Sequence, residues 1–307
     1  MRQILRSILL LTLLSLAAQH AYATHVRAGE IVARRISATS LTYEITLTTY
    51  YDLENGRPAA DAATSVDFYI GDVGPITVQR KQPITNIGNN TSRNEYTFVY
   101  TFPAPGTFTI STALQNRNNN VLNIGPPPTQ SIDFFIRSTL VINANLGLNR
   151  TPVLLNPPID LAAVGQRYIH NPGAFDADGD SLAYRIVTPQ RSSTAGRGRN
   201  VQYVDPNQVQ PVGPKEDGTF PSTFSINPIN GDLIWDAPAI PGFYNVAFVV
   251  EEWRNGVKIG EIVREMQIIV IDAPNDRPKL DSIPDLCVEA GTLIQQTIRA
   301  TDRNGNP

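Results

Sequence analysis

The sequence predicts an all-β protein built from β-sandwich domains in tandem, on three observations. First, 24 prolines and 21 glycines are spread along the 307 residues, and threonine, valine and isoleucine dominate the runs between them, which is typical of short strands joined by turns. Second, stretches such as "LTYEITLTTY" (41–50) and "YTFVYTF" (96–102) alternate as strands do. Third, no helical 3.6-residue stripe continues for more than two turns.

The composition and the charge argue against two classes of protein. Hydrophobic residues make up 41% and charged residues 17% of the chain, a balance typical of a folded protein and not of a disordered one. The formal net charge of −3 and the lack of a basic stripe argue against nucleic-acid binding. Beyond the first 23 residues no stretch approaches 18 apolar residues, so we expect no transmembrane segment.

Residues 1–23 have the pattern of a cleaved signal peptide. Arg2 and Arg6 give a positive start, "ILLLTLLSLAA" is a short apolar run, and "AYA" (21–23) is a small-x-small cleavage site. We therefore expect an exported protein, secreted or held at the cell surface. Its mature chain would begin at residue 24 with a net charge of about −5.

Residues 24–148 are expected to form an amino-terminal β-sandwich of roughly seven strands, ending with "SIDFFIRSTLVIN" (131–143). Its most conspicuous feature is an aromatic stripe on one face of a strand, formed by Tyr96, Phe98, Tyr100 and Phe102. Such a stripe can serve as a platform for sugars, but it is more often core, and core is the interpretation we favour.

Residues 149–274 are expected to form a second β-sandwich. Its strands include "DLIWD", "GFYNVAFVVEEW" and "VKIGEIVREMQIIVID". The pairs Asn230-Gly231 and Asn255-Gly256 indicate two-residue hairpin turns, because both centres of such a turn need positive φ. The polar segment 190–218, rich in glycine and proline, is predicted to be a long loop or arm inserted between strands.

An internal repeat links this second unit to the end of the chain. Residues 149–180 align with 275–306 at a constant offset of 126, with eight identities in 32 positions, which are turn prolines, turn glycines and an acidic motif among others. Residues 275–307 are therefore predicted to begin a truncated third domain, as at the front of a longer protein or in a truncated gene. Cys287, the one cysteine, falls here. We expect it to be buried in a strand, the alternative being a disulfide partner beyond this sequence.

The acidic motif "DADGD" contains Asp176, Asp178 and Asp180 at alternate positions, so their carboxylates can converge. Calcium takes six to eight oxygen ligands, which carboxylates and amides supply. The loop is not an EF-hand, because Val187 stands where the bidentate glutamate would be. We therefore predict a calcium site at this loop. The alternative is an Asp-Gly turn with solvated carboxylates.

A second predicted calcium site lies at the next junction, where the linker residues Asp272, Asn275 and Asp276 precede Asp302 and Asn304. The first linker offers only asparagines, Asn143, Asn145 and Asn149, so we expect the first site to be the weaker one.

Catalysis is not expected. His25 and His170 are the only histidines after residue 23, and neither a "GxSxG" nor an "HExxH" motif is present. Glu251 and Glu252 are adjacent in a predicted strand and so face opposite sides, which does not suit a pair of catalytic carboxyls.

Several motifs resemble known repeats. "DAPNDRP" followed by "ATDRNGN" is similar to the linker and acidic loop of cadherin repeats, and "AFDADGDSLAYRI" with "FSINPINGDLIWDAPAIPGFYNVAFVVEE" resembles cadherin-like repeats of bacterial surface proteins. The opening "HVRAGEI" resembles the amino-terminal region of large, type IX-secreted, gliding-motility-associated proteins of Bacteroidetes. The resemblance implies immunoglobulin-like (cadherin-like) sandwiches with calcium between consecutive domains.

These observations together predict a secreted or cell-surface protein with a structural or adhesive role and calcium-stabilised domain junctions. Its expected partners are other surface proteins or extracellular polysaccharide. The alternative is a carbohydrate-binding or accessory module of a larger exported enzyme that degrades polysaccharide.

Overall fold

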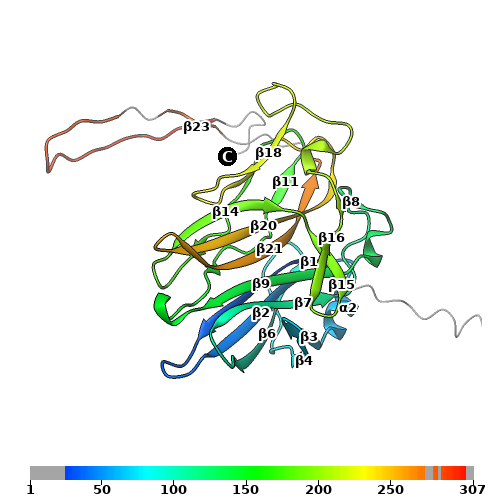
Figure 1. Cartoon of the computed structure of the whole chain (residues 1–307). Helices are drawn as coiled ribbons and strands as arrows, with labels where there is room; N and C mark the ends of the chain where they lie inside the picture. The colour runs from blue at the N-terminus through cyan, green and yellow to red at the C-terminus, as the bar shows by residue number, and fades with distance from the viewer. Residues whose placement is uncertain (1–24, 274–278, 283–284, 302–307) are drawn as a thin grey trace, which may run out of the picture.

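The computed structural model of the chain describes residues 25–273, 279–282 and 285–301 (Figure 1). Strand accounts for 51% and helix for 5% of the structure, and the large sheets are antiparallel, so the predicted all-β class is confirmed. None of the helices in the described ranges is long and apolar enough to cross a membrane.

The elements of the first half are, in chain order, β1 Val26–Arg35, β2 Thr42–Asp52, α2 Arg57–Ala62, β3 Ser65–Ile70, β4 Val73–Gln79, β5 Thr85–Asn86, β6 Thr91–Thr101, β7 Gly106–Leu114, β8 Ile124–Gly125, η1 Thr129–Ser131, β9 Phe134–Ile142 and η2 Ala144–Leu146.

The second half contains β10 Val153–Leu154, β11 Leu161–Ala163, β12 Tyr168–His170, β13 Ala174–Phe175, β14 Ser181–Val187, β15 Gln190–Thr194, β16 Arg197–Asn200, β17 Gln202–Tyr203, η3 Pro206–Gln208, β18 Thr223–Ile226, β19 Leu233–Asp236, β20 Gly242–Arg254 and β21 Val257–Ile271. Two short strands follow, β22 Lys279–Leu280 and β23 Ala300–Thr301.

Strands from both predicted domains close into one ring of antiparallel pairs. The ring runs β1-β2-β6, passes through an Arg80–Tyr96 bridge to β4, and continues β3-β7-β9. Strand β21 completes it, pairing with β9 at 260–262 and with β1 at Glu265 and Met266. The predicted boundary at 148/149 therefore does not separate two sheets, and two independent sandwiches are not confirmed.

The aromatic stripe lies in the core of this ring, as predicted. Tyr96 and Phe102 are buried, and Phe98 and Tyr100 pack against the same cluster of apolar side chains. The ring of Phe98 lies 4.7 Å from that of Phe68 between centroids. Because burial of aromatic rings contributes strongly to core stability, this face of β6 has a structural role.

The hairpin of β20 and β21 presents apolar side chains on both faces. Ala247 and Val249 of β20 belong to the core of the ring, whereas Val246, Phe248 and Val250 belong to a second core that also holds Trp235. This alternation follows from the two-residue period of a strand. A strand buried on both faces has a continuous apolar run in its sequence, as in "VAFVV" (246–250).

Of the two predicted two-residue hairpin turns, one is confirmed and the other is wider than predicted. Asn255 and Gly256 both have positive φ, 50° and 77°, and join β20 to β21 as predicted. Gly231 has a φ of 80°, but the turn from β18 to β19 is wider than two residues. The reason is that the Asn227 side chain accepts hydrogen bonds from the N–H groups of Ile229 and Asn230 and folds its own turn.

The polar segment 190–218 forms an arm that folds back onto the first half of the chain. Gln190 pairs with Phe135 of β9, and β17 pairs with β8. Arg197, at the start of β16, lies 2.8 Å from the carboxylate of Asp72. The predicted insertion is thus largely ordered by contacts with a distant part of the sequence.

The internal repeat is confirmed by backbone hydrogen bonds. Leu155 N–H donates to Gly173 O over 3.1 Å, and Asp281 N–H, 126 positions later, donates to Arg299 O over 2.9 Å. Strands β10 and β13 pair in the same register as β22 and β23, with Val153↔Phe175 and Leu154↔Ala174 matching Lys279↔Thr301 and Leu280↔Ala300.

The second copy of the repeat is more open than the first. Ala162 is buried, but Val288 at the matching position is 47% exposed. Cys287 is exposed with a free thiol, so the prediction that it is buried in a strand is wrong. Its counterpart Leu161 pairs with β21, whereas within the described ranges no strand is paired with Cys287.

Candidate cation site

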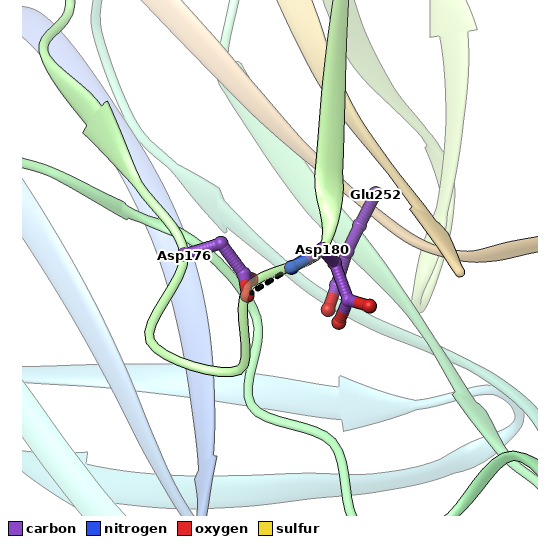
Figure 2. A group of neighbouring side chains, drawn as sticks. All are labelled: Asp176, Asp180 and Glu252. Carbon is purple, nitrogen blue, oxygen red and sulfur yellow. Dashed lines mark hydrogen bonds between the residues drawn. The ribbon is translucent and has the colours of Figure 1, made fainter. Parts of the chain in front are cut away.

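The acidic loop lies between β13 and β14 and is closed by its own first aspartate. One carboxylate oxygen of Asp176, Oδ1, accepts hydrogen bonds from the backbone N–H groups of Asp178 and Asp180, over 2.8 and 3.0 Å. Figure 2 shows the bond from Asp180. Gly179 has a φ of 82°, a conformation that glycine adopts without strain. The other oxygen of Asp176, Oδ2, is buried and has no hydrogen-bond partner in the part of the chain that the structure describes.

Arginine side chains neutralise the other two aspartates of the loop. Arg150 Nη2 lies 2.6 Å from Asp178 Oδ1, and the backbone N–H of Arg150 donates to the other oxygen of that carboxylate. Arg254 Nε donates to Asp180 Oδ1 over 2.7 Å. Asp178 is therefore engaged by Arg150 and does not join the other two carboxylates, so the structure does not bring the three predicted ligands together.

A residue that sequence reasoning missed takes the place of Asp178. The side chain of Glu252, near the end of β20, lies with Asp176 and Asp180, and one oxygen of each carboxylate falls within 4.8 Å of the others (Figure 2). Glu252 is fully buried. Its Oε2 accepts a hydrogen bond from Asn149 Nδ2 over 3.1 Å, whereas its Oε1 has no partner among the described residues.

Gly260 leaves room for this carboxylate. It lies directly opposite Glu252 on β21, and a Cβ at this position would stand 2.7 Å from Glu252 Oε2. Any larger residue would therefore displace the Glu252 side chain. The buried position of Glu252 thus depends on a glycine in the neighbouring strand.

Burial and like charges oppose the ionisation of Glu252. Desolvation is the largest influence; the hydrogen bond from Asn149 acts against it, while Asp176 and Asp180 add to it, and together they raise the pKa of Glu252 to about 9. Glu252 is therefore protonated at neutral pH unless a cation joins it. Because ligation of a metal requires the carboxylate, a cation bound here would displace that proton.

The charges of the site leave a deficit that a divalent cation matches. When every carboxyl group is ionised, four carboxylates face only two guanidinium groups, those of Arg150 and Arg254. Two negative charges are then uncompensated in a poorly hydrated place, which is costly. Hard oxygen ligands of this kind suit calcium.

The oxygens of the first linker meet Arg254 instead of the three-carboxylate cluster. Its guanidinium donates to the carbonyl oxygens of Leu146 and Leu148 over 2.6 and 2.9 Å and to Asn149 Oδ1 over 3.1 Å. Asn143 caps its own 3₁₀ turn by accepting from Asn145 N–H. The guanidinium group of Arg254 thus holds the linker against the acidic loop, which is part of the role that was expected of calcium.

Of the second predicted site, only Asp272 belongs to the described ranges, and it is exposed. Asn275, Asp276, Asp302 and Asn304 lie outside the described residues. The second calcium site therefore stays a prediction.

The signal that points to Glu252 was present in the sequence. Val246, Phe248 and Val250 alternate along β20 and all belong to one core, and Glu252 is the next residue on that face. The adjacent Glu251 faces the other way, as predicted, and lies 2.8 Å from Lys258 Nζ. A carboxylate that continues an apolar face is an unusual placement, and this is the signal in the sequence that indicates a ligand.

Comparison with protein-family models, with curated proteins and with solved structures gives no match. The chemistry of the site is therefore argued from its own residues.

Proposed function

We propose that this chain is a structural or adhesive β-protein of the cell surface or extracellular space whose fold is stiffened by a calcium ion at Asp176, Asp180 and Glu252. The observation that carries the proposal is that two buried carboxylate oxygens, Asp176 Oδ2 and Glu252 Oε1, have no partner within the described ranges. Buried polar atoms are nearly always satisfied. In the cation-free protein the proton of Glu252 faces Asp180, and a cation that replaces this proton would bind both unpartnered oxygens.

The cation would join parts of the chain that are far apart in sequence. Asp176 and Asp180 belong to the acidic loop, Glu252 to β20, and Asn149, which donates to Glu252, to the linker. Waters and backbone carbonyls would complete the six to eight ligands that calcium takes. Because the ion binds only the folded arrangement, its binding free energy adds to the free energy of unfolding.

The test is a calorimetric titration of the mature chain, residues 24–307, with calcium chloride. We expect one site with a dissociation constant of about 10⁻⁴–10⁻³ M, the range of extracellular calcium modules. Glu252→Gln removes one ligand and is expected to abolish the heat of binding. The matched control is Glu251→Gln, which changes the adjacent residue on the opposite face and leaves the titration as in the wild type.

Two results would contradict the calcium proposal. One is the absence of any binding heat up to about 10 mM calcium, which is tenfold above the weakest constant of that range. The other is an equal loss of binding in both glutamine variants, which would mean that the side chain of Glu252 has no special part in it.

The wider context of the proposal comes from the sequence. The signal peptide pattern at 1–23 supports export, and the cadherin-like motifs support tandem immunoglobulin-like domains in a surface protein of the gliding-motility-associated type. The same short strand pairing at an offset of 126 supports a repeated unit. Partners of such a protein would be other surface proteins or extracellular polysaccharide. Detection of the protein on intact cells with an antibody, before and after mild surface proteolysis, tests the location.

A further inference from the structure

A cleft opens where β9 separates from the β20–β21 hairpin. Strand β9 pairs with β21 only through residues 138–140. Nearer the start of β9, Phe135 pairs instead with Gln190 of the arm. The space between these two pairings is a cleft of about 550 Å³. Sites for small ligands usually have volumes of roughly 300–1,000 Å³.

The floor of the cleft is apolar and largely covered by neighbouring atoms. It is formed by Ala247 and Val263, which are buried residues of the central hairpin, and by Val187 and Phe135 beside them. Ala247, Val263 and Val187 belong to or pack against the core of the ring. Phe135 is buried but is not part of that core. Because most of these side chains are buried, the cleft exposes little apolar surface, and most of its accessible lining is polar.

The walls of the cleft carry hydrogen-bonding groups of both kinds. Gln190 Nε2 donates to Asn200 Oδ1 over 3.2 Å, and the two amides keep further donor and acceptor positions beside this bond. Gln208 adds a third amide, Thr188 a hydroxyl group and Asp205 a carboxylate. All of these come from the arm or from the turn that leads into it. The arm thus supplies the polar walls over an apolar floor.

The charged residues at the rim are already paired. Arg137 donates to Glu261 over 2.6 Å, and Arg185 donates to Glu251 over 3.1 Å. Glu265, which also lines the cleft, forms an ion pair with Arg117. Because these cations have carboxylate partners, the cleft has no excess of positive charge to attract an anionic ligand.

We propose that this cleft binds a neutral carbohydrate. A sugar carries many hydroxyl groups that both donate and accept, which fits a polar lining of uncharged amides and a hydroxyl group between paired charges. The inference goes beyond the calcium site: Glu252 lies on the opposite face of β20 from Ala247, so the two sites are separate.

The test uses the mature chain and a panel of neutral hexasaccharides from cellulose, xylan, mannan and starch, with hexagalacturonate as the anionic comparison. Binding is followed by calorimetry. At least one neutral oligosaccharide is expected to bind. Asn200→Ala and Gln208→Ala remove exposed side chains of the walls, and each is expected to weaken binding about fivefold, the effect of one lost hydrogen bond of about 1 kcal/mol.

Gln202→Ala is the matched control. Gln202 is exposed on the same arm, next to Tyr203 in β17, but it does not line the cleft, so this variant is expected to bind as the wild type does. The proposal is overturned if no neutral member of the panel binds at millimolar concentration, if only hexagalacturonate binds, or if Gln202→Ala weakens binding as much as the two wall variants. Calcium titration of the same samples reports separately on the cation site.

Discussion

Replacement of Glu252 by glutamine is expected to stabilise the calcium-free protein at neutral pH while removing its response to calcium. Burial beside Asp176 and Asp180 raises the pKa of Glu252 to about 9 from its usual 4.5. The folded state therefore keeps a proton that the unfolded chain has lost, and stability falls as pH rises from 4.5 to about 9. Each pH unit costs about 1.4 kcal/mol, so the cost at pH 7 is about 3 kcal/mol.

Glutamine has the shape of the protonated glutamic acid and cannot ionise, so it avoids this cost. Glu252→Gln is accordingly expected to raise the free energy of unfolding by up to about 3 kcal/mol at pH 7 in the presence of a chelator, and by little at pH 4.5. Urea denaturation at a series of pH values, followed by tryptophan fluorescence, measures both. In the wild type, calcium at a hundredfold excess over its dissociation constant should add about 2.7 kcal/mol, and in the variant it should add nothing.

Glu251→Gln is again the control. Glu251 is only partly buried and pairs with Lys258 and Arg185, so its loss should cost about 1 kcal/mol or less and leave the calcium response intact. The reasoning about Glu252 would be refuted if Glu252→Gln were less stable than the wild type from pH 7 upward in chelator, or if calcium stabilised both proteins equally.

Three further changes test other parts of the structure. Arg254→Met is expected to lower the free energy of unfolding by about 3 kcal/mol, because it leaves the buried carboxylate of Asp180 unpaired; a loss under about 1 kcal/mol in urea would contradict this. Burial raises the pKa of Glu261, but the hydrogen bonds and charges of its cationic neighbours outweigh burial and lower it. The contribution of Glu261 to the free energy of unfolding is thus present above pH 4.5 and lost on acidification. Glu261→Gln should therefore be less stable than the wild type at pH 7 and equally stable in acid. A difference in stability that does not change with pH would refute this reasoning. Gly231→Ala should cost about 1–3 kcal/mol, because φ is 80° and the new Cβ would lie 2.7 Å from the Tyr184 ring; an unchanged melting temperature would contradict it.

Local patterns were sufficient for the class of fold and for several of its parts. Alternation of apolar residues indicated the strands, and the aromatic stripe was correctly assigned to the core. The constant offset of 126 indicated a repeat that the structure shows in the register of β10 with β13 and of β22 with β23. These features depend on residues that are close in sequence or on direct comparison of two segments.

Long-range pairing could not be predicted in the same way. The ring closes because Ala28 pairs with Met266. No local pattern in either strand indicates that the other strand is its partner. The same limit explains the site. Convergence of Asp176, Asp178 and Asp180 was inferred from an extended backbone, but the Asp176 side chain folds the loop into a turn, and Arg150 binds Asp178.

The most direct test of the account is a crystal structure of the mature chain grown with calcium, using the anomalous signal of the ion. We predict one anomalous peak about 2.3–2.6 Å from Asp176 Oδ2 and Glu252 Oε1, with Arg254 still on Asp180. A peak at Asp178 instead, or a cluster of the three carboxylates with no peak at saturating calcium, would contradict the proposed cation site.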